Sequence, residues 1–122
     1  MSMRYDQDRK RIICRWEEPT EVVMNKKKGV INRSRMITVK VNDNGKLNSK
    51  DIRRHQKHPM FQYINRFNAM LNRYECFPSC EGEYRCAVCG SEHGVSPHFD
   101  AKRQSIIWLC REHRDDSPKV DA

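Results

Sequence analysis

Apolar and polar residues alternate in the first forty residues in a pattern that predicts β-strands. The clearest segment spans residues 36–41, where the β-branched Ile37, Val39 and Val41 are separated by polar side chains. The sequence Asn-Asp-Asn-Gly at residues 42–45 has strong turn chemistry and should end this strand.

Two more strand segments are predicted upstream of this one. Residues 11–16 are rich in apolar side chains and should form a strand that ends at residues 17–19, Glu-Glu-Pro. Residues 21–24 and 30–32 should pair as a hairpin across residues 25–29, a loop of hairpin length that contains a glycine.

Helical periodicity begins after this β-rich region. Asn48 is a suitable N-cap for a short helix through Ile52 and His55, and Pro59 fits the first turn of a second helix. Apolar residues then recur at helical spacing, which predicts that one face of the second helix packs against the core. These residues are Met60, Ile64, Phe67, Leu71 and Tyr74.

The length and composition favour one compact unit that needs additional stabilisation. The chain has 122 residues, of which 37% are hydrophobic and 33% are charged. Its core is therefore modest, and small domains of this kind are often held together by a metal ion or by disulfides. No segment approaches the ~20 apolar residues of a membrane helix, and the first residues lack the apolar run of a signal peptide. We therefore expect a protein of the cytoplasm (the host cytoplasm, if it is viral) with no membrane partner.

The cysteines predict a metal site in the C-terminal part. In a reducing compartment, clustered cysteines indicate metal binding rather than disulfides. Cys86 and Cys89 form a Cys-x-x-Cys turn, and Gly90 directly after it permits the tight backbone of a zinc knuckle. Cys110 and His113 supply a second pair at a spacing that predicts a closed Cys3His zinc site. The histidine argues against the main alternative, an iron–sulfur cluster.

The residues between the two pairs complete a recognisable pattern. Residues 95–99 and 105–109 should form a hairpin over residues 100–103, and Cys110 and His113 should open a short final helix. Knuckle, hairpin and helix in this order resemble the treble-clef zinc finger. The motifs are similar to those of small zinc proteins encoded by bacteriophages and grouped with the HNH nucleases, over about a quarter of the chain. They are Cys86-x-x-Cys89-Gly90, His98-Phe99-Asp100 and Ile107-Trp108-Leu109-Cys110-x-x-His113.

The resemblance implies a nuclease site that this chain matches only in part. His98 would be the general base, and Asp100 or its neighbour would bind the catalytic ion. The histidine that the family usually places beyond the last zinc ligand is missing, and so is the middle asparagine of the hairpin. We therefore expect a protein that is not an enzyme, with an HNH-like endonuclease as the alternative.

The remaining cysteines have different expected roles. Cys76 and Cys80 form a looser Cys-x-x-x-Cys pair that allows a second zinc site, or a rearranged single site in which one of them replaces a ligand. Cys14 lies in an apolar run and should be a small buried hydrophobic residue.

Positive charge is concentrated in the N-terminal part of the chain. The net charge is +8; residues 1–75 contain 18 Lys and Arg against 8 Asp and Glu, whereas residues 76–122 contain 6 against 8. Such segregation is typical of proteins that present a basic face to a polyanion. We expect phosphate contacts from three groups of basic residues. These are Lys26, Lys27 and Lys28; Arg33 and Arg35; and Arg53, Arg54 and Lys57.

Together these observations predict an α+β protein with two regions. Residues 1–75 would form a basic β-plus-helix region, and residues 76–122 a treble-clef-like zinc module packed against it in one compact unit. The favoured function is a zinc-stabilised protein that binds DNA or RNA, such as a regulator or a recombination or replication accessory of a phage or mobile element. The alternatives are the HNH-like nuclease and a viral module that binds a host protein such as a polymerase.

Overall fold

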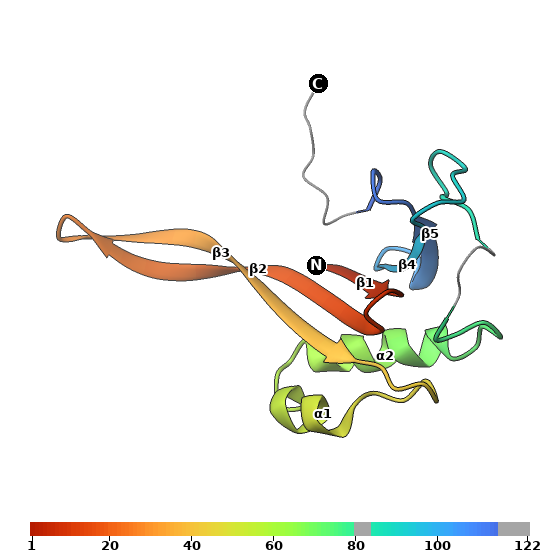
Figure 1. The fold of residues 1–122 in the computed structure, drawn as a ribbon. Coiled ribbons are helices and arrows are strands. Elements are labelled where there is room, and N and C mark those ends of the chain that lie inside the picture. The colour runs from red at the N-terminus through yellow and green to blue at the C-terminus, as the bar shows by residue number, and fades with distance from the viewer. Residues whose placement is uncertain (80–83, 115–122) are drawn as a thin grey trace.

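The computed structural model describes residues 1–79 and 84–114, which form a single antiparallel sheet with two helices on one face (Figure 1). The sheet has five strands in the order β3-β2-β1-β4-β5. The predicted mixture of helices and strands is therefore confirmed. The elements are β1 (Ser2–Asp6), β2 (Arg11–Met24), β3 (Lys27–Lys40), α1 (Ser49–His55), α2 (Phe61–Leu71), β4 (Ser96–Asp100) and β5 (Ser105–Leu109).

Strands β2 and β3 form a long two-stranded ribbon. Their pairing continues without interruption from Arg11 opposite Lys40 to Met24 opposite Lys27. Asn25 and Lys26 connect them, with φ of 51° and 64°. Positive φ at both central positions is characteristic of the type I′ turn, whose twist matches that of the flanking strands. The predicted hairpin is therefore confirmed, but its loop is two residues and not five.

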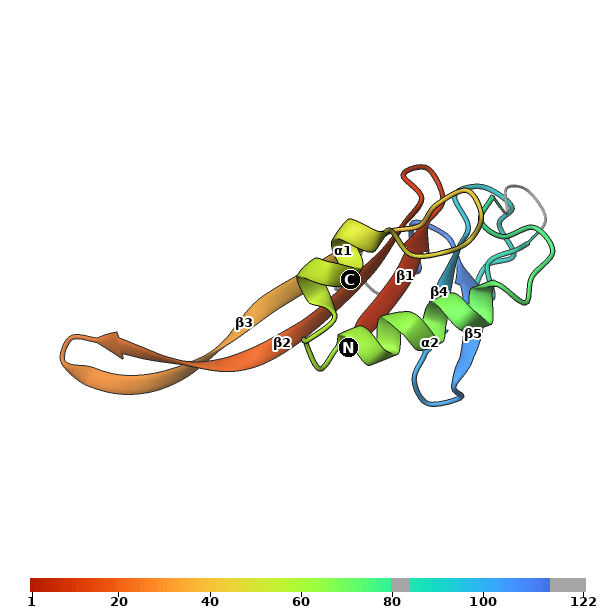
Figure 2. The same cartoon turned by 90° about the horizontal axis from the view of Figure 1, so that it is seen from below.

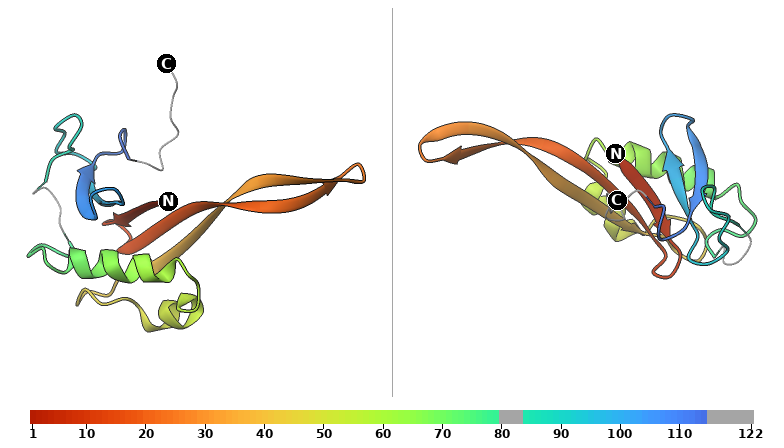
Figure 3. Two further views of the ribbon diagram at one scale, coloured as in Figure 1. Left: turned by 180° about the vertical axis from the view of Figure 1, so that it is seen from behind. Right: turned by 90° about the horizontal axis from the view of Figure 1, so that it is seen from above.

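The prediction that residues 17–19 end the first strand is wrong. β1 pairs with β2 only over Arg11–Arg15, so farther along the chain β2 has β3 as its only strand neighbour. Pro19 can lie in such a strand because a proline without an N–H is tolerated where one edge is unpaired. The two strands therefore leave the body of the protein together as a projecting ribbon, which Figures 2 and 3 show from three further directions.

The two helices pack against the sheet and close the main core. Asn48 caps α1 as predicted, because its side chain accepts a hydrogen bond from the backbone N–H of Lys50. The predicted apolar face of the second helix is confirmed at Ile64, Phe67 and Leu71, which are buried together with Phe61. The core combines residues of β1, β2, β3, α2 and β4. It contains Met3, Tyr5, Ile12, Cys14, Ile37, Val39, Val41, Leu47, Phe61, Ile64, Phe67, Leu71 and Phe99.

The predicted C-terminal hairpin is confirmed as β4 and β5, and it belongs to the same sheet. β1 pairs with β4 at Arg4 and His98, so the first strand of the chain joins the ribbon to this hairpin. A smaller cluster of Cys86, Leu109 and Cys110 packs separately beside β5. After β5, residues 111–113 form a turn, and the helix expected there is not present in the described part of the chain. The treble-clef arrangement therefore stays a prediction.

The described helices are not suited to cross a membrane. In residues 1–79 and 84–114 the helices are α1 and α2, and neither has the length and apolarity that a membrane-spanning helix needs.

Candidate metal centre

Cys86 and Cys89 lie on a tight turn in the segment before β4. The backbone N–H of Cys86 donates to the carbonyl of Ser91 at 2.9 Å, and the N–H of Gly90 donates back to the carbonyl of Cys86 at 2.9 Å. Gly90 has φ of +74°, a left-handed conformation that glycine adopts without a steric cost. This geometry places both thiols on the same side of the turn, as the sequence predicted.

The hairpin brings the second pair of ligands to this turn. The N–H of Ala87 donates to the carbonyl of Trp108 at 2.8 Å, which fixes the turn beside the end of β5. Cys110 follows β5 directly, and the N–H of His113 donates to the carbonyl of Cys110 at 3.1 Å. Residues far apart in the sequence therefore converge at one point.

The four side chains form a compact group that can hold a metal ion. The ligand atoms of Cys86, Cys89, Cys110 and His113 all lie within 4.8 Å of one another. The distance from Cys89 Sγ to Cys110 Sγ is 3.7 Å, and His113 Nδ1 lies 3.7 Å from Cys86 Sγ and 3.2 Å from Cys110 Sγ. In a tetrahedral site with Zn–S of about 2.3 Å and Zn–N of about 2.0–2.1 Å, these separations are about 3.8 Å between sulfurs and about 3.6 Å between sulfur and nitrogen. The donor set and its dimensions therefore fit a tetrahedral ion.

The surroundings of Cys86 and Cys110 lower the pKa of each thiol and favour the thiolate form that a metal ion requires, whereas those of Cys89 raise the pKa of its thiol. Burial raises the pKa of Cys86, but hydrogen bonds from the backbone N–H groups of Cys89, Cys110 and Val88 outweigh burial and lower this pKa to about 6. The hydrogen bond with Cys110 raises the pKa of His113. A bound cation competes with protons at all four groups, because it needs thiolates and a neutral imidazole.

The other cysteines lie outside this group. Cys14 is buried in the main core, as predicted, and burial raises its pKa to about 11. Cys76 is disulfide-bonded and is not part of the metal-ligand group found among the described residues. Because a disulfide sulfur is not a thiolate, Cys76 is not available to bind a metal ion in this structure, contrary to the predicted second site; Cys80 lies outside the described residues.

The two residues of the alternative nuclease site are both engaged in the structure. His98 is completely buried, and its Nδ1 lies 3.0 Å from the carbonyl of Ser96. The Asp100 carboxylate accepts hydrogen bonds from the backbone N–H groups of Lys102 and Arg103 and shapes the β4–β5 turn. In this conformation the imidazole of His98 has no path to a phosphodiester in solvent.

The structure places the predicted phosphate-binding residues in three locations. Lys26, Lys27 and Lys28 lie at the tip of the ribbon, and Arg33 and Arg35 lie farther along β3. The remaining three, Arg53, Arg54 and Lys57, are exposed on α1 and just after it. The sequence analysis found the basic side chains but missed the ribbon that carries five of them. Residues 17–19 were expected to end the strand, but the pairing of β2 with β3 continues through them.

A comparison of the chain with protein families, with curated proteins and with solved structures finds no match. The function is therefore inferred from the residues and their geometry.

Proposed function

We propose that this protein is a zinc-stabilised nucleic-acid-binding protein whose β2–β3 ribbon enters a groove of duplex DNA or RNA. The observation that carries the proposal is the ribbon itself, which projects beyond the body of the protein with a basic tip (Figure 2). The major groove of B-DNA is wide enough to admit a two-stranded β-ribbon. A regulatory or accessory role in a phage or mobile element rests only on the resemblance of the zinc motifs.

The dimensions of the ribbon suit this role. Residues 16–24 of β2 extend past the pairing with β1. At about 3.3 Å per residue this part of the ribbon is roughly 30 Å long, which is several times the thickness of a base pair. Residues 27–36 of β3 are all exposed, so one strand presents its side chains to solvent along its projecting length.

The charge of the ribbon also suits contact with two phosphate backbones. Lys27 pairs with Met24 and Lys28 pairs with Val23, so these two lysines point to opposite faces of the ribbon. A groove has a phosphate backbone on each side, and a tip that is basic on both faces can contact both. The exposed Val23 and Met24 beside the lysines offer apolar contact with base edges such as the thymine methyl group.

Acidic residues on β2 oppose this charge only in part. Glu18 contacts Arg35, with 3.4 Å between Oε2 and Nε, and accepts a hydrogen bond from Trp16 Nε1 at 2.8 Å. This network lies near the root of the ribbon. Glu17 and Glu21 are exposed on β2 and provide negative charges that a test can remove.

Zinc is the proposed ion because three thiolates and one imidazole form the donor set of closed structural zinc sites. All four positions of a tetrahedral ion would be filled by protein, so the ion would have a structural role. When bound, it would hold the turn at Cys86 and Cys89 against the end of β5.

The salt dependence of binding to a short duplex tests the proposal. Replacing Lys26, Lys27 and Lys28 together by glutamine should flatten the slope of log affinity against log salt by about 2.7, if each lysine neutralises one phosphate. The control variant, Glu17→Gln with Glu21→Gln, alters the same ribbon with the opposite change of charge and should strengthen binding. Both variants should keep the circular dichroism spectrum and metal content of the parent.

Two outcomes would overturn the proposal. One is an unchanged salt slope in the triple lysine variant. The other is a parent protein that fails to bind duplex or single-stranded nucleic acid at low salt, which would favour a module that binds another protein.

A further inference from the structure

A cleft of about 680 Å³ lies between the β1–β2 turn and the loops that carry the metal ligands. Its walls come from both halves of the sequence and meet because β1 pairs with β4. Three arginines come from β1, the β1–β2 turn and β2, and two come from the segment after β5. They are Arg4, Arg9, Arg11, Arg111 and Arg114.

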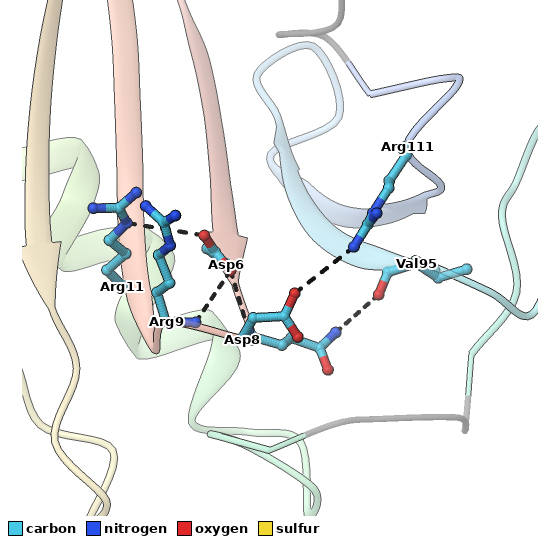
Figure 4. Close-up of polar contacts among 7 residues, drawn as sticks. Asp6, Asp8, Arg9, Arg11, Val95 and Arg111 are labelled. Atoms are coloured by element: carbon cyan, nitrogen blue, oxygen red, sulfur yellow. Dashed lines mark hydrogen bonds and ion pairs between the residues drawn. The ribbon is translucent and has the colours of Figure 1, made fainter.

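Among the described lining residues, the three carboxylates Asp6, Asp8 and Glu92 are fewer than the five arginines. Asp6 accepts hydrogen bonds from the backbone N–H groups of Asp8 and Arg9 at 3.1 and 3.2 Å, which shape the β1–β2 turn. Its other oxygen lies 3.9 Å from Arg11 Nε (Figure 4). The third carboxylate, Glu92, lies 2.7 Å from Arg85, which is not a lining residue. The described lining residues therefore carry five guanidinium groups against three carboxylates.

The metal-ligand segment fixes the position of Arg111 at the cleft. Arg111 directly follows the ligand Cys110, and its Nη2 lies 3.9 Å from Asp8 Oδ2 on the opposite wall. Figure 4 shows this contact beside the hydrogen bond from Gln7 Nε2 to the carbonyl of Val95, which measures 3.0 Å. The aliphatic part of Arg111 packs over Gly94, where an added Cβ would lie 3.2 Å from its Cγ. The Arg111 side chain is 73% exposed and lines the cleft between Gly94 and Asp8.

We infer that this cleft binds phosphate groups, either in a nucleic-acid backbone or as a free phosphate. Guanidinium groups bind phosphate through paired, charge-assisted hydrogen bonds, and several of them converging in one cleft suit an anion with several oxygens. Apart from the His93 imidazole, no aromatic side chain is present among the described lining residues. The described lining therefore favours contacts with phosphate over stacking with a base. The site is separate from the ribbon and does not depend on the function proposed for it.

Titration with two probes tests the inference on the full-length, metal-loaded protein. Inorganic phosphate, followed through the NMR signals of arginine Nε–H groups, should shift the signals of Arg9 and Arg111. A short duplex should bind with a measurable salt dependence. The test variant is Arg9→Gln with Arg111→Gln. The control is Lys102→Gln with Arg103→Gln, which removes the same charge at the exposed β4–β5 turn.

The expected effects are large enough to separate the variants. The test variant should weaken phosphate binding about tenfold or more, because it removes two charge-assisted contacts. It should weaken duplex binding about 30-fold at 0.15 M salt, if each arginine neutralises one phosphate. Arg9→Gln alone, which lies away from the metal ligands, should give about a fivefold loss. Unchanged metal content in each variant excludes an indirect effect through the metal centre.

The outcomes also identify the source of the phosphate. Loss of affinity for the duplex alone assigns the cleft to a nucleic-acid backbone, and loss for inorganic phosphate alone assigns it to a small phosphate ligand. Either result supports the inference. A test variant that behaves like its control with both probes overturns it, and so does a parent protein that binds neither probe at low salt. The ribbon proposal fails separately, because the triple lysine variant should leave the binding of inorganic phosphate unchanged.

Discussion

Replacing Cys89 by serine should release the metal ion and unfold the loops that carry its ligands, while the main core stays folded. The reason is the unequal size of the two clusters. The main core contains thirteen buried residues, whereas Cys86, Leu109 and Cys110 form the small cluster beside the metal ligands. Each ordered residue costs about 1–2 kcal/mol of conformational entropy, and each fully buried apolar side chain returns about 1.5–3 kcal/mol.

The small cluster can therefore order only a few residues without a metal ion. Binding of a metal at a free concentration a thousand times its Kd adds about 4 kcal/mol of stability, and structural zinc in small modules supplies more than this. Loss of one thiolate should remove most of that contribution. We expect the metal content to fall from one equivalent to near zero and local protection from hydrogen exchange to disappear around Cys86 and Cys110.

Trp108 offers a direct reporter of this local unfolding. Its ring stacks on Tyr84 with centroids 3.8 Å apart, and its carbonyl accepts the hydrogen bond from Ala87. The other tryptophan, Trp16, lies at the root of the ribbon, so the Trp16→Phe background isolates the signal of Trp108. Removal of the metal should shift the emission of Trp108 to longer wavelength as its ring becomes exposed to water.

Cys14→Ala is the matched control, because Cys14 is buried in the main core and lies outside the metal-ligand group. It should lower the free energy of unfolding while the metal content and the emission of Trp108 stay unchanged. The reasoning is refuted if Cys89→Ser keeps a full equivalent of metal, or if it loses the metal with no change in Trp108 emission or hydrogen exchange.

Three further predictions concern pH, packing and catalysis. The folded-state pKa of Cys86 is lowered to about 6 from its ordinary value of 9.0, so in the metal-free protein its contribution to stability is fully present above pH 9 and is lost as the pH falls through about 6; the free energy of unfolding of the metal-free protein, measured against pH, should follow this fall. Phe67→Ala should cost about 3–5 kcal/mol in urea unfolding, because the ring is completely buried between the helix and the sheet. Duplex DNA should stay intact with magnesium, manganese or nickel, because His98 is buried; cleavage by the parent that disappears in His98→Ala would contradict this.

The group of four side chains that can hold a metal ion could be predicted from the sequence because the spacing within each pair is local. Cys86 and Cys89 share one turn, and Cys110 and His113 share another, so each pair is recognisable without knowledge of the fold. The same holds for Asn48, whose capping interaction reaches only to Lys50. Local chemistry decides these positions, and pairing with distant strands does not alter them.

The parts that the sequence did not reveal depend on long-range pairing. The strand through Pro19 continues because β3 pairs with it on one side, and nothing near Pro19 in the sequence indicates this. Strand β1 was not predicted, since its short mixture of apolar and charged residues becomes a strand only between β2 and β4. The arginine-lined cleft was missed for the same reason, because Arg9 and Arg111 line one cleft only after β1 has joined the two halves.

The central place of β1 also has a consequence for the order of folding. Strand β1 lies in the middle of the sheet, and it is synthesised well before its partner strand, because Arg4 pairs with His98, 94 residues farther along the chain. Contacts between residues that are this far apart in the sequence form slowly, because a long loop must close before the contacts can stabilise the fold. During translation β1 and β2 can pair, but the other edge of β1 stays open until β4 emerges, and open edges are where chains associate with one another. We therefore expect the yield of folded protein to improve when synthesis is slowed or cooled, since the C-terminal hairpin then has time to close the sheet before two nascent chains meet.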